Sequence, residues 1–174
     1  MQKKITMKLK ISILTLILCL SACSISYKFN GAMIDYSKTK TISVADFPSV
    51  AESNPYTALP YEFSEALRDI YTRQTRLQVI KSGGDMNLEG EITSLQLAPM
   101  AISEDSYAAQ TKVTITIRVR YSNKAVPEDD FEKTYSAFRQ FSSSTTLNDA
   151  LSTLVPEIIK EITEMIFNDT AGKW

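Results

Sequence analysis

Hydrophobic and polar residues alternate most regularly between Thr111 and Tyr121. One side of this segment collects Thr111, Val113, Ile115, Ile117, Val119 and Tyr121. The other side collects Lys112, Thr114, Thr116, Arg118 and Arg120. Because successive side chains of a strand point to opposite faces, this alternation predicts a β-strand with one buried face and one exposed face.

A long strand is predicted to precede this segment. Its first apolar residues share one face, and its later ones fall on the other: Met86, Leu88, Gly90 and Ile92, then Leu95 and Leu97. This slip of phase near Thr93 and Ser94 predicts a β-bulge or a strong twist within one strand.

A third strand is predicted over residues 131–141, returning antiparallel to the regular segment. If Tyr121 pairs with Phe131, then Arg120 lies opposite Glu132 on the exposed face. The pairing therefore predicts that part of the positive charge on that face is neutralised across the strands.

Two segments carry apolar residues at helical spacing. The first runs from about Tyr61 to Thr75, and Pro60 suits the first helical position. The second carries the stripe Leu147, Leu151, Leu154, Val155, Ile158, Ile162, Met165 and Ile166. Pro156 interrupts this stripe, and an interior proline costs a helix about 3 kcal/mol. We therefore expect either a kink or a short helix followed by a second one.

Shorter segments complete the predicted fold. Residues Thr41–Phe47 alternate as a first strand ended by Pro48, Leu77–Ile80 is a short extended piece, and Gly83–Asp85 is a turn. The resulting order is β-α-β-β-β-α. It predicts an α+β two-layer sandwich, in which a mixed sheet of about four strands is covered on one face by two helices.

The amino end has the pattern of a secretory signal. Lysines crowd the first ten residues, and the apolar run Ile11–Leu20 is too short for a membrane helix, which needs about 20 residues. The run closes with Leu20-Ser21-Ala22-Cys23, which resembles the lipobox of bacterial lipoproteins. We predict cleavage before Cys23, with a diacylglycerol and an N-acyl lipid on that cysteine. The alternative is an ordinary secretory signal with an incidental cysteine.

This interpretation divides the chain into three parts. Residues 1–22 are the signal peptide that is removed, 23–40 form a lipidated tether, and 41–174 form a single α/β domain. Of the two cysteines, Cys19 leaves with the signal and Cys23 is acylated, so the mature chain keeps no free thiol.

The charge balance argues against nucleic acid as a partner. Four of the 19 basic residues precede Cys23, which leaves 15 against 20 acidic residues in the mature chain. Phosphate backbones are bound by a clustered excess of Lys and Arg, and this chain has the opposite balance.

The residues that catalysis needs are mostly absent. The chain has no histidine, which excludes Ser-His-Asp and Cys-His nucleophile pairs and histidine-bearing zinc sites. The acidic runs Glu104-Asp105 and Glu128–Asp130 lie in polar loops and are typical of solvated charge. The sequence therefore predicts no enzyme, no cofactor beyond the lipid and no metal site.

One group of residues is a candidate ligand site. Lys112, Arg118 and Arg120 form a basic stripe that can meet an anionic group such as a lipid phosphate. The alternative is an outer sheet face that is partly neutralised by Glu132.

Several motifs, in order, resemble the lipopolysaccharide-assembly lipoprotein family LptE in its Bacteroidetes-type form. After the lipobox they are Tyr27–Gly31, Thr41–Pro48, Phe63–Asp69, Gly84-Asp85, Leu88–Thr93, Thr114–Asn123, Ile166–Asn168 and Trp174. Together they cover essentially the whole mature chain.

The resemblance implies a non-enzymatic role and the same fold of two helices on a four-stranded sheet. Family members lie at the periplasmic side of the outer membrane, inside the β-barrel LptD, where they help the barrel to assemble and pass lipopolysaccharide outward. The loops that bind lipopolysaccharide in the enteric branch look like 102–109 and 142–147 here. Neither contains Lys or Arg, so those ligand residues are not carried over.

The sequence leaves one other function open. A free-standing lipoprotein could bind small amphiphiles or serve as a scaffold for another envelope complex. Residue Ser24, after the acylated cysteine, lacks the aspartate that retains lipoproteins at the inner membrane in enteric bacteria, so we expect the outer membrane.

Overall fold

The computed structural model describes residues 34–100 and 109–172. The elements are β1 (Thr41–Val44), α2 (Leu59–Gln74), β2 (Gln78–Ile80), β3 (Met86–Met100), β4 (Gln110–Asn123), the 3₁₀ turn η1 (Pro127–Asp129), β5 (Phe131–Ser142) and α3 (Leu147–Thr170). The predicted signal peptide, Cys23 and the Glu104-Asp105 run lie outside the described residues.

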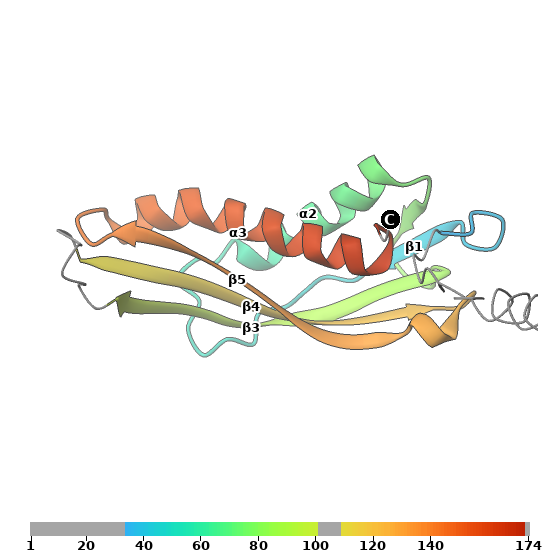
Figure 1. Ribbon diagram of the computed structural model, residues 1–174, viewed down its shortest axis with the longest axis horizontal. Helices are drawn as coiled ribbons and strands as arrows, with labels where there is room; N and C mark the ends of the chain where they lie inside the picture. The colour runs from blue at the N-terminus through green and yellow to red at the C-terminus, as the bar shows by residue number, and fades with distance from the viewer. Residues whose placement is uncertain (1–33, 101–108, 173–174) are drawn as a thin grey trace, which may run out of the picture. The chain divides into compact units, whose positions relative to one another are not determined.

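The strands form one mixed sheet in the order β2-β1-β3-β4-β5. β1 is parallel to both β2 and β3, whereas β3, β4 and β5 are antiparallel. Figure 1 shows α2 and α3 on the same side of the sheet. The predicted α+β sandwich is confirmed, and the sheet has a fifth strand because the short extended piece, Gln78–Ile80, pairs with β1.

The register of the long strands agrees with the pattern of the sequence. Tyr121 pairs with Phe131, and Arg120 lies opposite Glu132. The register between β3 and β4 shifts between Ile92 and Ser94, which confirms the predicted bulge. The bulge returns Leu95 to the buried face, whereas Leu97, further along the strand, is exposed.

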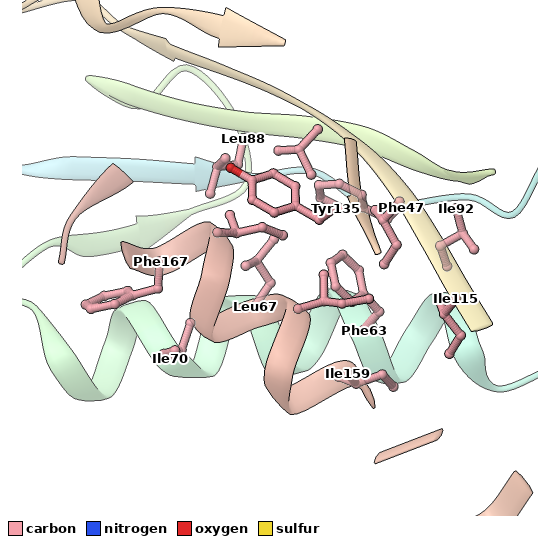
Figure 2. Close-up of a cluster of buried hydrophobic side chains, with 14 of the residues drawn as sticks. Phe47, Phe63, Leu67, Ile70, Leu88, Ile92, Ile115, Tyr135, Ile159 and Phe167 are labelled. Atoms are coloured by element: carbon pink, nitrogen blue, oxygen red, sulfur yellow. The ribbon is translucent and has the colours of Figure 1, made fainter. Parts of the chain in front are cut away.

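The hydrophobic core lies between the sheet and the helices (Figure 2). Phe47 and Phe63 meet edge to face, with ring centroids 5.1 Å apart, and Tyr71 lies against Phe167 at 5.3 Å. These four side chains come from the segment after β1 and from both helices. The core therefore joins the two helices to each other as well as to the sheet.

Helix α3 is continuous through Pro156, so the predicted alternative of two separate helices is wrong. Pro156 and Ser152 are both exposed, and the carbonyl that Pro156 leaves without a donor can bond to water. Val155 and Ile158, on either side, are fully buried and hold the helix on the sheet. The expected kink stays a prediction.

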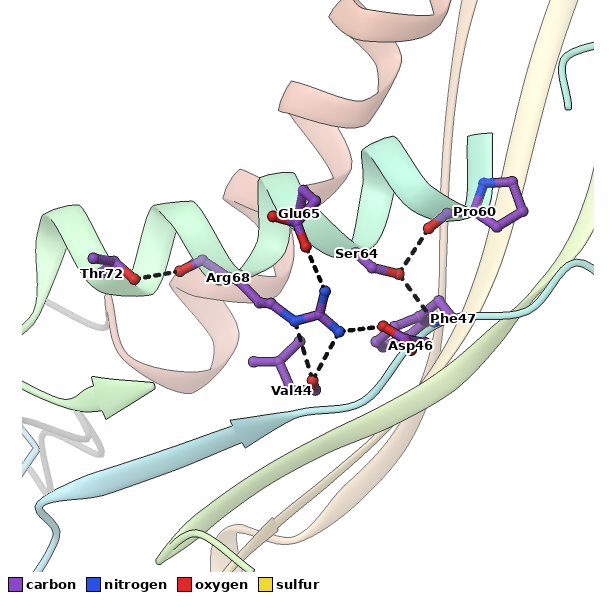
Figure 3. Close-up of polar contacts among 8 residues, drawn as sticks. All are labelled: Val44, Asp46, Phe47, Pro60, Ser64, Glu65, Arg68 and Thr72. Carbon is purple, nitrogen blue, oxygen red and sulfur yellow. Dashed lines mark hydrogen bonds and ion pairs between the residues drawn. The ribbon is translucent and has the colours of Figure 1, made fainter. Parts of the chain in front are cut away.

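A half-buried arginine ties α2 to the end of β1 (Figure 3). The Arg68 guanidinium donates to the Val44 carbonyl from Nε at 3.4 Å and from Nη2 at 3.3 Å. It also pairs with Asp46 and with Glu65. β1 ends at Val44 instead of continuing to Phe47 as predicted. Its neighbour β2 ends at Ile80, opposite Ser43, and Arg68 supplies the donor that β2 no longer offers to the Val44 carbonyl.

Asp85 fixes the start of β1 and gives the fold a pH dependence. Its carboxylate accepts hydrogen bonds from the backbone N–H of Lys40 at 2.8 Å and of Thr41 at 3.0 Å, and from the Thr41 hydroxyl at 2.9 Å. These bonds, the one from Lys40 first, lower the pKa of Asp85 below its ordinary value of 3.8. A lowered pKa stabilises the fold above pH 3.8, and this contribution is lost as the pH falls through the folded pKa.

We therefore expect Asp85→Asn to lower the urea midpoint at neutral pH and to reduce the loss of stability on acidification. Urea titrations of both proteins from pH 7 down to about pH 3 measure this. Equal pH dependence in the two proteins would exclude Asp85 as a source of the acid sensitivity.

Candidate functional site on the open face of the sheet

The face of the sheet turned away from the helices carries the predicted site residues. We call it the open face, and its side chains include Glu89, Glu91, Lys112, Thr114, Thr116, Arg118, Arg120, Glu132, Thr134, Ser136 and Phe138. All of them are partly or fully exposed. The strands place these residues in rows across β3, β4 and β5, so that side chains from three parts of the chain lie side by side.

Two of the predicted basic residues lie in ion pairs. Arg120 contacts Glu89 at 3.1 Å on one side and Glu132 at 3.2 Å on the other. Its hydrogen bonds to Glu132 and Glu89 raise the pKa of Arg120. Arg118 pairs with Glu91 in the next row. Positive and negative charges therefore alternate at this end of the open face. The alternative interpretation of the basic stripe expected this neutralisation by Glu132.

Lys112 has a different environment. Its ammonium lies 5.4 Å from the centroid of the Phe138 ring, a cation–π arrangement. Within residues 34–100 and 109–172, no carboxylate lies within ion-pair distance of Lys112. The Phe138 side chain is 52% exposed, unlike the core aromatics. Lys112 and Phe138 together form a cationic and apolar patch, next to Ala98 and Met100 on the same face of β3.

The structure does not bring the three predicted ligand residues together. At the usual rise of a strand, Lys112 and Arg118 are about 20 Å apart along β4. Between them lie hydroxyls that bond across the strands, with the Thr116 and Ser136 oxygens 3.2 Å apart. One phosphate cannot contact both ends of the stripe, so Lys112 and the arginine pair are separate places on the open face.

Sequence reasoning missed Phe138. The signal was present, because Phe138 has the same parity along β5 as Glu132 and therefore shares its face. An aromatic residue on the polar side of an alternating strand indicates an exposed apolar group, and Phe138 has this position.

The two helices enclose a groove of about 560 Å³ on the other side of the molecule. Its apolar lining residues are Ala66, Ile70, Pro156 and Ile159, and its charged lining residues include both signs. In the described part of the chain, no cluster of acidic side chains has the arrangement of a metal site. No helix there has the length and apolarity of a membrane span.

The fold and the open face define a small two-layer α+β module with a charge-paired sheet surface. A family model described as "LptE: Lipopolysaccharide-assembly" matches residues 39–170. The chain belongs to the LptE family, a non-enzymatic lipoprotein family, and this membership supports a role in lipopolysaccharide assembly.

Solved structures of similar fold include protein XCC0632 from Xanthomonas campestris, at 11% identity and a TM-score of 0.52, over 74% of this chain and 81% of that one. The rare lipoprotein B from Shewanella oneidensis matches at 15% identity and a TM-score of 0.48, over 72% and 93%. A minor lipoprotein from Acinetobacter baumannii matches at 12% identity and a TM-score of 0.48, over 75% of this chain and 90% of that one. No curated protein sequence matches the chain.

Proposed function

We propose that this protein is an outer-membrane lipoprotein that acts as plug and assembly partner of an LptD-type β-barrel during lipopolysaccharide transport. The observation that carries the proposal is the match to the lipopolysaccharide-assembly family over residues 39–170. The lipid on Cys23 would hold the domain at the periplasmic side of the membrane.

The open face has the chemistry that a plug requires. The lumen of a membrane barrel is polar, so a surface enclosed by it has to offer polar groups. Arg118 and Arg120 already have carboxylate partners on their own surface. Enclosing this face therefore leaves neither charge without a partner, which avoids the large penalty of an enclosed unpaired charge.

Co-purification tests the proposal directly. Tagged protein extracted from outer membranes in mild detergent should bring down one large β-barrel protein in a fixed ratio, and depletion of the chain should lower both mature barrel and surface lipopolysaccharide. A chain that is recovered alone from intact outer membranes would contradict it.

The anchor can be tested separately. We expect Cys23→Ala to remove the lipid from the amino terminus, since the thiol of this cysteine is the predicted site of acylation. Cys19→Ala is the matched control, because Cys19 lies in the predicted signal and should leave attachment unchanged. Mass spectrometry of the mature amino terminus measures the lipid.

Lys112 is the residue of the basic stripe that is free to meet an anionic lipid. We expect Lys112→Ala to weaken lipopolysaccharide binding roughly tenfold, because one charge-assisted hydrogen bond contributes about 1.5 kcal/mol or more. Lys40→Ala removes the same charge from the exposed segment just before β1 and should have little effect. Equal losses in both variants would indicate a non-specific charge effect.

The groove between the helices favours a second candidate, a free-standing module that binds small amphiphiles. Its volume of about 560 Å³ lies within the range of ligand sites. A stable monomer that binds lipid in solution, and whose loss leaves surface lipopolysaccharide unchanged, would establish this function in place of the first.

A further inference from the structure

The free edges of the sheet are protected very unequally. Strand β2, at one end of the order, has only 3 residues. The far half of β3, beyond its pairing with β1, contains the bulge and Pro99. Strand β5, at the other end, has 12 residues, and neither a proline nor a register shift interrupts it. Proteins usually shield a long edge strand with such features, because its main chain can pair with another strand.

The register shows which groups of β5 face outward. The N–H of Ser143 donates to the Ala109 carbonyl at 2.9 Å, one step beyond the pair of Ser142 and Gln110. Bonded pairs recur at every second residue of an antiparallel ladder, so the odd-numbered residues of β5 bond to β4. The even-numbered residues direct their N–H and C=O away from the sheet: Glu132, Thr134, Ser136, Phe138 and Gln140.

Other contacts agree with this parity. The N–H of Lys124 donates to the Asp85 carbonyl at 2.9 Å, so β4 uses its even-numbered residues for β3. The Phe138 carbonyl accepts from the Arg139 side chain at 2.9 Å, which an outward carbonyl can do. The edge of β5 is therefore a row of main-chain donors and acceptors at regular spacing.

Helix α3 leaves this row open. It reaches β5 through odd-numbered side chains on the face of the sheet. Tyr135 donates to Asp169 at 2.7 Å, and Arg139 contacts Glu157 at 3.0 Å and Glu161 at 2.7 Å. None of these contacts uses the main chain of the even-numbered residues.

We propose that the free edge of β5 pairs with a strand of the partner barrel, an inference that rests on the proposed function. A regular row of N–H and C=O groups is complemented by another extended backbone. The 12 residues of β5 match the length of a membrane-barrel strand, about 9–11 residues. The polarity also matches: Thr134 and Ser136 lie on one face and Tyr135 and Ala137 on the other, and barrel strands alternate in the same way.

This pairing would form while the barrel is being assembled. A closed barrel has no free strand edge, so its strands can pair with β5 only before the barrel closes. The edge of β5 would hold a terminal barrel strand in an extended conformation until its own neighbour replaces it. The polar open face then remains available for contact with the lumen.

Proline substitution tests the edge without disturbing the sheet. Thr134→Pro removes an outward N–H, keeps every bond between β5 and β4, and changes a side chain with no hydrogen bond of its own in the described structure. Thr134→Val keeps the N–H and is the matched control. Gln140→Pro repeats the test at the other end of the strand, and thermal melting of each purified protein verifies folding.

The expected result is recovery of the barrel with wild type and Thr134→Val, and roughly tenfold less with each proline variant that folds.

Each other outcome has a distinct meaning. Equal recovery with Thr134→Pro and Thr134→Val overturns the edge proposal and leaves the plug in place. No barrel with wild type overturns the proposed function itself. A dimer of the purified chain that Thr134→Pro abolishes, with barrel recovery unchanged, assigns the edge to a second copy and also overturns the proposal.

Discussion

Phe63→Ala is expected to lower the free energy of unfolding by about 3–5 kcal/mol, the usual cost of truncating a buried phenylalanine. The Phe63 side chain is fully buried, and its ring lies edge to face against Phe47 at 5.1 Å. It projects from α2 into the layer between helix and sheet (Figure 2). Truncation removes apolar contact on both sides and leaves a cavity that the two rigid layers cannot close.

Tyr61→Ala is the matched control. It removes an aromatic ring from the same helix, but this ring is 71% exposed. We expect Tyr61→Ala to change the free energy of unfolding by no more than about 0.5 kcal/mol. Urea unfolding at a fixed pH gives both values, and similar losses for the two variants would mean that Phe63 does not hold α2 on the sheet.

The second large effect is expected at Gly90, where the sheet leaves no room for a side chain. A Cβ atom built there would lie 2.1 Å from the Arg118 carbonyl oxygen and 2.7 Å from Cε1 of Phe47. The first neighbour is backbone of the adjacent strand and cannot move without breaking the ladder. We expect Gly90→Ala to lower the free energy of unfolding by about 3 kcal/mol or more, at the upper end of the range for overpacked sites.

Two comparisons separate the causes at this position. Glu89→Ala changes the neighbouring residue on the exposed face and should cost less than about 1 kcal/mol. Adding Phe47→Leu to Gly90→Ala relieves the side-chain clash but not the backbone clash, so the two losses should combine non-additively. A Gly90→Ala protein as stable as wild type would show that β3 and β4 can separate locally.

The extent to which the sequence predicted the fold varied with element length. β4 was predictable because its alternation is long and its two faces differ in polarity. β2 was not counted as a strand, since its 3 residues are too few for a pattern and only pairing with β1 makes them one. The end of β1 was placed too late because its neighbour β2 ends at Ile80, and Arg68, from a distant helix, binds the Val44 carbonyl in its place.

The open face was predictable in composition but not in pairing. Glu132 could be matched with Arg120 because one short connection joins β4 to β5. The partners on β3, Glu89 and Glu91, depend on a register that the bulge resets. The free edge of β5 could not be predicted at all, because the position of a strand at the end of a sheet depends on the order of all the others.

The contacts between α3 and β5 also determine how the molecule responds to force. Lys133 and Tyr135 hold the end of the helix through Asp169, and Arg139 holds its middle through two glutamates. A pull along β5 is therefore transmitted in part to α3 through these side chains. A partner that exerts tension on this edge would be pulling against two elements of the fold instead of one.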